Sequence, residues 1–217
     1  MAFSIIVIFI GAYLLGSINF AIIFTSAFTD KDVREYGSFN AGATNTLRVA
    51  GVLPGVLAFL GDVLKGFAAC GIGILCFKYM YNNSLCGIQP IIGAYLCGVC
   101  CFIGHLFPVF FQFRGGKGVA VCVGIFLICC TKAIIIGLLV FALMVVITRI
   151  VSVSSLSATL ITVIMSIVFG NQGVSLLPQC LCAIFMGGAI FIKHSNNIKQ
   201  LLAGNEKKIT FKRNKNG

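Results

Sequence analysis

The sequence contains very little charge, and most of that charge has one sign. Only 10% of its 217 residues are charged, just 5 are Asp or Glu, and there are 2 His and no Trp. A water-soluble domain carries about 25% charged residues, which it needs to cover its surface. The shortage of charge therefore excludes a soluble globular protein.

Long apolar runs make up most of the chain. Hydrophobic residues account for 59% of it, and the mean hydropathy is +1.06. Runs of about 18 or more apolar residues are typical of transmembrane helices. The sequence predicts an all-α integral membrane protein, a polytopic bundle of seven transmembrane helices that forms a single domain over residues 1–217. The expected spans cover residues 3–28, 52–79, 88–107, 153–169 and 176–192, and two more lie within 119–148.

The apolar stretch 119–148 is divided because of its length and because it contains Lys132. As one helix it would reach about 45 Å, whereas the hydrocarbon core of a bilayer is about 30 Å thick. A lysine at mid-membrane is also costly. We therefore expect two short helices that turn at Lys132.

The basic residues lie mainly in loops between the apolar runs. The chain has 16 Lys and Arg against 5 Asp and Glu, a net charge of +11. With seven spans and a cytoplasmic C-terminus, thirteen basic residues are cytoplasmic and only Lys78 and Lys132 lie outside. This distribution follows the positive-inside rule, predicts an external N-terminus, and explains the charge without a nucleic-acid partner. The 11 cysteines lie mostly in apolar runs, where we expect them to pack as small apolar groups and to form neither disulfides nor a metal site.

Three polar clusters are predicted on the cytoplasmic face, and the first covers residues 37–48. It supplies hydroxyl, amide and guanidinium groups through Ser38, Asn40, Asn45 and Arg48. Backbone N–H groups and an arginine fork are suited to binding phosphate. An anion-binding loop with Asn40 and Asn45 as ligands is one interpretation. A solvated turn with Arg48 as a topological anchor is the other.

The second and third clusters have a similar character. Three glycines surround a lysine in Gly115-Gly116-Lys117-Gly118, which follows His105. Such a loop allows the backbone to approach a phosphate closely, or is simply flexible. The third cluster contains His194, Asn197 and Glu206. Its alternative interpretation is an amphipathic basic stretch on anionic lipid.

Two further groups of polar residues lie within apolar runs. Asp62 and Lys65 are three residues apart and so share a helix face. Ionisable residues there are expensive and indicate function, so we assign Lys65 to substrate binding and Asp62 to a structural role; a purely structural pair is the alternative. Small hydroxyls near Arg149 either line the same pocket or pack helices, with Ser155 assigned to binding; they are Ser152, Ser154, Ser155 and Ser157.

Together these segments resemble the bacterial integral-membrane glycerol-3-phosphate acyltransferases that take acyl phosphate as donor. The resemblance extends over essentially the whole chain in five ordered segments. They are Gly16-Ser17, the pattern Gly-Ser-x-Asn-x-Gly-Ala-Thr-Asn-x-x-Arg at 37–48, Gly61 to Gly66, Gly104 to Ala120, and His194-x-x-Asn197-Ile198 with Gly204-x-Glu206.

The resemblance also implies roles for individual residues. Ser38, Arg48, His194 and Asn197 match catalytic positions, loop 115–118 matches the glycerol 3-phosphate site, and Glu206 matches a mainly structural glutamate. Three positions depart from the family pattern, with Phe39 at a usual glycine, Asn19 at a usual proline and Gln200 at a usual arginine. We expect Phe39 to reshape the first loop and Gln200 to remove one phosphate contact.

The implied reaction transfers a fatty acyl group from acyl phosphate to sn-glycerol 3-phosphate and gives 1-acylglycerol 3-phosphate (lysophosphatidate) and phosphate. Acyl phosphate is already activated, so no cofactor or metal is expected. His105, whose ordinary pKa is about 6.5, is one candidate general base. A substrate phosphate with a pKa near 6 is the other.

The donor and the location follow from the same resemblance. Phe110 and Lys199 stand five positions after the two histidines, so the chain lacks the His-x-x-x-x-Asp box of thioester-using acyltransferases. We expect a separate soluble phosphate acyltransferase to supply the acyl phosphate, and the site to face the cytoplasm from the lipid of the bacterial plasma membrane. A small transporter of phosphorylated solutes is the alternative function, since intramembrane charges also mark transport sites.

The topology can be tested with reporter fusions. Fusions after Asn83 and after Lys132 should both report the outer side, because both positions lie in the sparsely charged loops. A cytoplasmic signal after Lys132 would contradict the seven-span arrangement.

Overall fold

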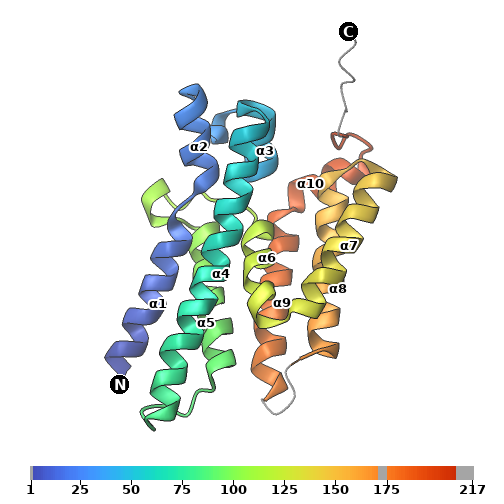
Figure 1. The fold of residues 1–217 in the computed structure, drawn as a ribbon. Coiled ribbons are helices and arrows are strands. Elements are labelled where there is room, and N and C mark those ends of the chain that lie inside the picture. The colour runs from blue at the N-terminus through green and yellow to red at the C-terminus, as the bar shows by residue number, and fades with distance from the viewer. Residues whose placement is uncertain (1, 171–174, 209–217) are drawn as a thin grey trace.

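The computed structural model describes residues 2–170 and 175–208, and this part of the chain is helical without strands (Figure 1). The long helices are α1 (Ala2–Ser17), α2 (Phe20–Thr29), α4 (Val52–Asn82), α5 (Pro90–Leu106), α6 (Val119–Cys129), α7 (Thr131–Thr148), α8 (Val151–Val168) and α9 (Leu176–Lys193). The loops contain the short elements η1 (Val33–Glu35), α3 (Ala43–Ala50), η2 (Val109–Phe111) and α10 (Ser195–Leu202). The basic residues of the tail beyond 208 lie outside the described residues.

The long helices form one bundle that has the short elements at one end. Helix α4 packs against α1, α5 and α6, while α7 pairs with α8, which also packs against α9. In Figure 1, α1 begins at the lower end, and α2, α3 and α10 lie at the upper end. The residues of the three predicted clusters therefore lie at the same end of the bundle, where Gly116 of the second cluster faces Ala41 of the first.

Within the described residues, six helical segments are long and apolar enough to cross a membrane, with α1 and α2 counted as one segment. Helix α6 has only 11 residues, which correspond to about 16 Å at 1.5 Å per residue. This is well short of the roughly 30 Å of a hydrocarbon core. The all-α membrane architecture is confirmed, whereas the count of seven spans and the sidedness of the termini stay predictions.

The first predicted span is interrupted, and the stretch 119–148 is divided into two helices. The first stretch breaks between Ser17 and Phe20, where the Oδ1 of Asn19 accepts a hydrogen bond from Ile22 N at 3.1 Å and caps α2. The stretch 119–148 divides at Cys130, which has an extended φ of −157°. The expected turn at Lys132 is therefore displaced by two residues, and Lys132 lies in the first turn of α7.

Glycines allow two pairs of helices to approach closely. An added Cβ on Gly66 of α4 would lie 2.4 Å from the carbonyl oxygen of Val121, and one on Gly124 of α6 would lie 1.9 Å from that of Val63. Gly16 of α1 and Gly104 of α5 face the partner backbone in the same reciprocal way. Small residues at crossing points are typical of packing within membranes, and these two crossings set the register of α1, α4, α5 and α6.

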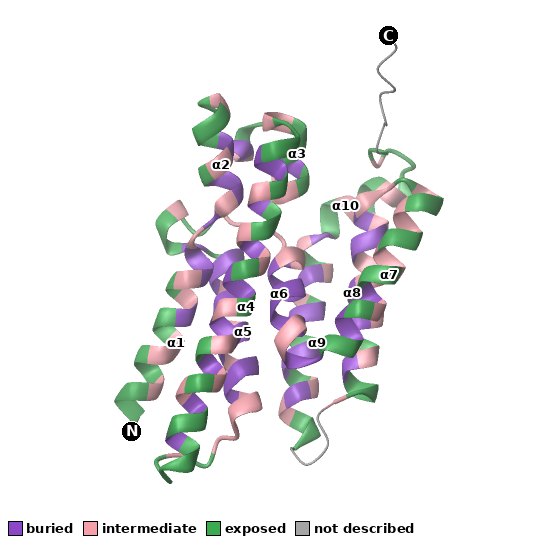
Figure 2. Ribbon diagram, viewed as in Figure 1, coloured by how far each residue is buried: buried purple, intermediate pink, exposed green. Residues whose placement is uncertain are grey.

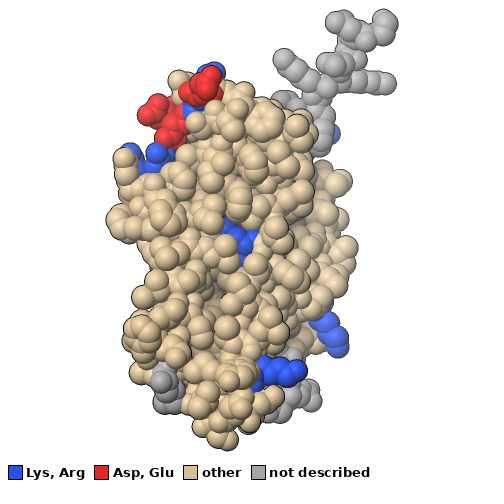
Figure 3. All heavy atoms as spheres, turned by 60° about the vertical axis from the view of Figure 1, so that its left-hand side comes forward, with Lys and Arg blue, Asp and Glu red and all other residues tan. Residues whose placement is uncertain are grey.

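The surface between the two ends is apolar, as a membrane requires. Large exposed hydrophobic side chains extend along α1, α4 and α7, including Leu75, Leu139 and Val146, and Figure 2 shows these helices with outward-facing exposed residues. In the view of Figure 3, acidic residues gather at the upper end, and the surface below them is mostly uncharged, with Lys and Arg atoms visible at mid-height and near the lower end. Asp30, Asp32 and Glu35 lie in this end loop.

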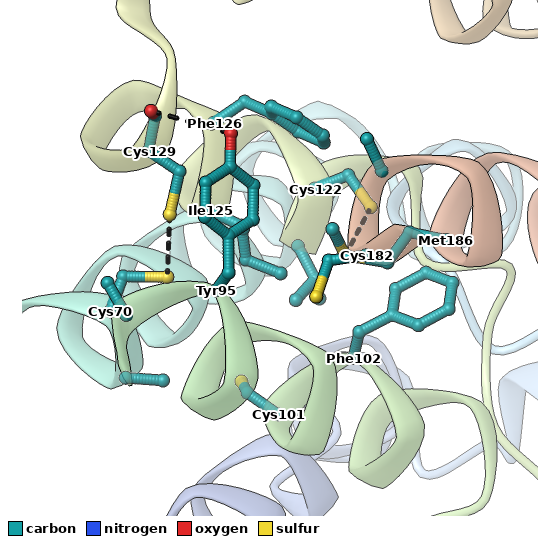
Figure 4. Packing of buried hydrophobic residues seen from close by; sticks show 14 of the residues in the cluster. Cys70, Tyr95, Cys101, Phe102, Cys122, Ile125, Phe126, Cys129, Cys182 and Met186 are labelled. Atoms are coloured by element: carbon teal, nitrogen blue, oxygen red, sulfur yellow. Dashed lines mark hydrogen bonds between the residues drawn. The ribbon is translucent and has the colours of Figure 1, made fainter. Parts of the chain in front are cut away.

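The interior is built from aromatic residues and cysteines. Cys70 and Cys129 face each other with their sulfurs 3.8 Å apart, and the Tyr95 hydroxyl donates to the Cys129 carbonyl at 3.5 Å (Figure 4). Cys122 contacts Met186 of α9. These thiols pack as small apolar groups, as predicted.

The α4–α6 crossing gives a stability prediction. Gly124→Ala should lower the thermal unfolding temperature of the protein in detergent, because the new Cβ overpacks the crossing at a cost of about 1–3 kcal/mol. Gly188→Ala in α9 is the matched control, since no heavy atom lies within 4 Å of its added Cβ. Equal unfolding temperatures for the two variants would contradict the close approach of α4 and α6.

Candidate functional site

The first cluster is organised by the side chain of Asn45. Its Nδ2 lies 2.8 Å, 2.9 Å and 3.1 Å from the carbonyl oxygens of Val33, Tyr36 and Asn40, and its Oδ1 accepts from Ser38 N at 2.8 Å. The side chain is buried, and both of its polar atoms are occupied by the loop. This geometry favours a positioning role for Asn45 over the direct substrate contact predicted for it. Ser38 is exposed on the loop and Asn40 is half-buried.

Phe39 adopts an unusual backbone conformation in this loop. Its φ is +56°, in the left-handed region, and 71% of the residue is exposed. Left-handed φ is easily adopted by glycine and costs other residues about 1–2 kcal/mol. We expected Phe39 to reshape the first loop, and the structure shows where its effect lies. The loop keeps a glycine-like backbone and places an aromatic ring on the outside.

Arg34 joins the first cluster to the segment that precedes the glycine loop. Its guanidinium pairs with Asp32 at 2.6 Å, and its Nη1 donates to the carbonyl of Phe111 in η2 at 2.9 Å. The Arg34 guanidinium holds the pKa of the Asp32 carboxyl below its usual range. The loops 30–45 and 107–118 are therefore bound together at the same end of the bundle.

The glycine loop rests on His105. Gly116 N donates to the His105 carbonyl at 3.2 Å. An added Cβ on Gly115 would lie 2.0 Å from that carbonyl oxygen, and one on Gly116 would lie 2.3 Å from the ring Nε2 and 2.6 Å from the Ala41 carbonyl oxygen. The sequence suggested that these glycines allow approach to a phosphate. In the structure, the close approach at Gly115 and Gly116 is to the protein itself.

Lys117 stands at one end of a chain of four hydrogen-bonded residues. Its Nζ donates to Asn197 Oδ1 on α10, and Asn197 Nδ2 donates to Glu206 Oε1 at 2.7 Å. Ser152 on α8 donates to the same glutamate oxygen at 2.7 Å. Burial and the nearby charge of Arg48 on α3 lower the pKa of Lys117 to about 8, although the Glu206 carboxylate opposes this shift.

His194 lies buried at the junction of α9 and α10, next to this network. Its Nδ1 lies 2.8 Å from the carbonyl oxygen of Ile190, so Nδ1 carries the proton and Nε2 is left as an acceptor. Burial, assisted by the Lys117 charge, lowers the pKa of His194 to about 4. The imidazole is therefore neutral at physiological pH.

A buried cluster of Asp62, Lys65 and His105 lies beneath the glycine loop. The Lys65 Nζ lies 2.8 Å from Asp62 Oδ1, 3.1 Å from His105 Nδ1 and 2.6 Å from the carbonyl oxygen of Ile18. Each of the three side chains is at most 3% exposed. The ammonium group is therefore paired with the Asp62 carboxylate and has hydrogen-bond partners in Ile18 and His105. This arrangement favours a structural role for Lys65 over the substrate contact predicted for it.

The structure thus brings most of the predicted site residues to one end of the bundle. Lys117, Asn197 and Glu206 are joined by hydrogen bonds. The charge of Arg48 lowers the pKa of Lys117, and the charge of Lys117 lowers the pKa of His194. Ser155 is buried one helical turn from Ser152 and has no link to Glu206.

Sequence reasoning missed two groups. Ser152, not Ser155, reaches Glu206, and its proximity to Arg149 was the only signal for this set of serines. The Ile18 carbonyl pairs with Lys65, and the departure at Asn19 was the signal that the helix breaks there.

The fold and the site define a class, an integral membrane protein whose loops gather basic and polar side chains at one end of a helical bundle. Residues 6–204 match the family model described as glycerol-3-phosphate acyltransferase. The chain is 38% identical over 198 residues to glycerol-3-phosphate acyltransferase 2 of Bacillus anthracis, covering 91% of this chain and 95% of the relative. The chain belongs to the glycerol-3-phosphate acyltransferase family.

Solved structures show the same fold. Two crystal structures of PlsY (YgiH), an integral membrane glycerol 3-phosphate acyltransferase, superpose with TM-scores of 0.83 for the glycerol 3-phosphate form and 0.79 for the lysophosphatidic acid form. Both are 32% identical to this chain and cover 95% of it, and the chain covers 96% of each.

The left-handed backbone at Phe39 gives a prediction for the first loop. Phe39→Gly should raise the thermal unfolding temperature, because relief of the left-handed conformation outweighs the added flexibility of the unfolded chain by about 0.5–1 kcal/mol. Tyr36→Gly removes an exposed aromatic ring from the same loop at a φ of −132° and should lower that temperature. Stabilisation by both variants would show that loss of the aromatic ring, and not φ, is responsible.

Proposed function

We propose that this protein acylates the 1-hydroxyl of sn-glycerol 3-phosphate with acyl phosphate as donor, and releases lysophosphatidate and inorganic phosphate. The observation that carries the proposal is the convergence of Lys117, Asn197, Glu206, His194 and Arg48 at one end of a membrane bundle. The chain shares this architecture with PlsY over nearly its whole length.

The two phosphates of the substrates fit the basic groups of this site. Lys117 and Arg48 are close enough to repel each other, and an anion between them relieves that repulsion. Arginine also binds phosphate in a bidentate manner. The Lys117–Asn197–Glu206 network fixes the direction of the ammonium group, so little side-chain freedom is lost when a phosphate binds.

The chemistry requires one bond to form and one to break at the acyl carbon. The glycerol hydroxyl oxygen attacks the carbonyl carbon of the mixed anhydride, and the carbon–oxygen bond to the phosphate then breaks with its electron pair on the phosphate. Lys117 and Arg48 stabilise the developing negative charge on the carbonyl oxygen and the leaving phosphate. Ser38, which is exposed on the first loop, is proposed as a further hydrogen-bond donor to these oxygens.

The hydroxyl proton passes to a substrate phosphate in this proposal. His105 is buried, its Nδ1 is occupied by Lys65 and its Nε2 lies against Gly116. His194 has a free Nε2, but with a pKa of about 4 it does not hold a proton at neutral pH. A phosphate with a pKa near 6 is a better acceptor, and His194 Nε2 orients the hydroxyl.

The proposed location is the cytoplasmic face of the bacterial plasma membrane, which the distribution of basic loops supports. There the apolar tail of the donor stays in the lipid while the anhydride reaches the site. A soluble phosphate acyltransferase is the proposed source of the donor. The transporter alternative is not favoured, because the described intramembrane charges of Asp62 and Lys65 form an ion pair with each other, and Lys65 also contacts Ile18 and His105.

The donor is tested with purified protein and labelled glycerol 3-phosphate. Palmitoyl phosphate should give lysophosphatidate, whereas palmitoyl-CoA and palmitoyl acyl carrier protein at equal concentration should give none, because the sequence lacks the His-x-x-x-x-Asp box that drives attack on a thioester. Robust turnover with palmitoyl-CoA would contradict the donor assignment. The absence of product with all three donors would contradict the proposed function.

The pKa of Lys117 predicts a pH dependence. With a pKa of about 8 in the free protein, Lys117 loses its charge as the pH rises through 8, and kcat/KM for glycerol 3-phosphate should fall in that range. Lys117→Arg keeps its charge and should show a lower but level kcat/KM up to pH 9.5. An enzyme-free blank at each pH corrects for donor hydrolysis. An identical fall in Lys117→Arg would assign the titration to another group.

A further inference from the structure

The cluster of Asp62, Lys65 and His105 lies directly under the glycine loop, and its contacts are all with the protein itself. Lys65 Nζ lies within hydrogen-bond distance of the Ile18 carbonyl and of His105 Nδ1, and it forms an ion pair with Asp62. Losing any one of these partners would leave a buried charge or donor without compensation, which is costly. Lys65 is therefore committed to the protein interior.

This commitment fixes the tautomer of His105. Its Nδ1 lies 3.1 Å from the Lys65 ammonium and 3.5 Å from Asp62 Oδ1. An ammonium can only donate, so Nδ1 is the acceptor and the ring proton resides on Nε2. A proton on Nδ1 would instead remove His105 as an acceptor for Lys65, and Nδ1 could then donate only over the longer 3.5 Å contact to Asp62 Oδ1. His105 is thus a neutral imidazole held from below by Lys65.

The opposite side of His105 supports the loop. The main-chain carbonyl of His105 accepts from Gly116 N. The ring Nε2 and the Ala41 carbonyl both lie within 2.6 Å of the point where a Cβ of Gly116 would be. His105 therefore contacts the glycine loop through its ring and its backbone, at a point that the first cluster also reaches. Lys117 is the next residue in the chain.

We propose that Asp62, Lys65 and His105 form a positioning unit which holds the loop 115–118 so that Lys117 meets Asn197, and that His105 does not act as a base. The proposal rests on the proposed function only for its kinetic readout. Its structural content is that the conformation of the loop depends on the hydrogen bond that His105 Nδ1 accepts from Lys65.

The test compares two substitutions at His105. His105→Asn places an amide oxygen near the position of Nδ1 and can accept from Lys65, but an amide cannot serve as a base. His105→Ala provides neither function. We expect His105→Ala to raise KM for glycerol 3-phosphate at least tenfold, and His105→Asn to recover most of this loss with a pH profile of unchanged shape. If His105→Asn loses turnover as fully as His105→Ala, His105 is a base and the proposal is overturned.

A coupling measurement asks whether His105 acts through Lys117. In the double variant His105→Ala/Lys117→Ala, the loss in kcat/KM should equal that of Lys117→Ala alone to within about threefold, because residues that act as one unit are not additive. Losses that multiply would show that His105 acts independently of Lys117, and would overturn the proposal.

Hydrogen exchange of the loop provides a readout that does not depend on activity. In the intact protein, peptides covering residues 113–119 should exchange faster in His105→Ala and Lys65→Met, and at the wild-type rate in His105→Asn. Unchanged exchange in His105→Ala would overturn the positioning role. If the wild-type protein makes no lysophosphatidate, the proposed function fails while this exchange experiment still decides the positioning role. If Lys65→Met does not fold, the comparison at His105 remains sufficient.

Discussion

The fold depends on how the ammonium group of Lys65 is accommodated away from water. A buried charge is tolerated only when it is paired and its hydrogen-bonding capacity is used. Here the three acceptors come from the α1–α2 break, α4 and α5. The break at Ile18 supplies a carbonyl that an unbroken helix would occupy with its own N–H. One lysine therefore ties together the kink of the first membrane segment, the register of α4 and the side chain of His105.

The glycine crossings provide the precision that this cluster needs. Gly104 precedes His105, and a Cβ added to Gly104 would meet the backbone of Tyr13. A Cβ added to Gly16 would meet the backbone of Cys101. Helices in a membrane gain no hydrophobic driving force by pairing, so close backbone packing sets their relative height. The crossing of α1 and α5 thus fixes the level at which His105 meets Lys65 below it and the loop above it.

Much of this architecture could be predicted from hydropathy, charge and motifs, because these properties are local in the sequence. The pairing of Asp62 with Lys65 follows from their spacing of three on one helix. Their other partners, Ile18 and His105, are 47 and 40 residues from Lys65, and no spacing rule connects them. Asn45 and Gly116 were also predicted to bind substrate, because a sequence shows that a residue is polar or small but not which atoms surround it. The displacement of the turn from Lys132 to Cys130 has the same origin, since hydropathy locates a break only to within a few residues.

The short length of α6 has a consequence for how the two reactants meet. Helix α6 is largely buried among other helices, so its 11 residues do not force the bilayer to thin around it, as a lipid-facing helix of that length would. Instead, the missing turns are replaced by the polar loop that ends at Gly118, and α6 lies below α3 and α10 in the view of Figure 1. In the proposed reaction, an amphiphile diffusing laterally in the leaflet and a solute arriving from water would then meet at one depth, without extraction of the acyl tail from the lipid. The less soluble reactant would thereby search in two dimensions instead of three.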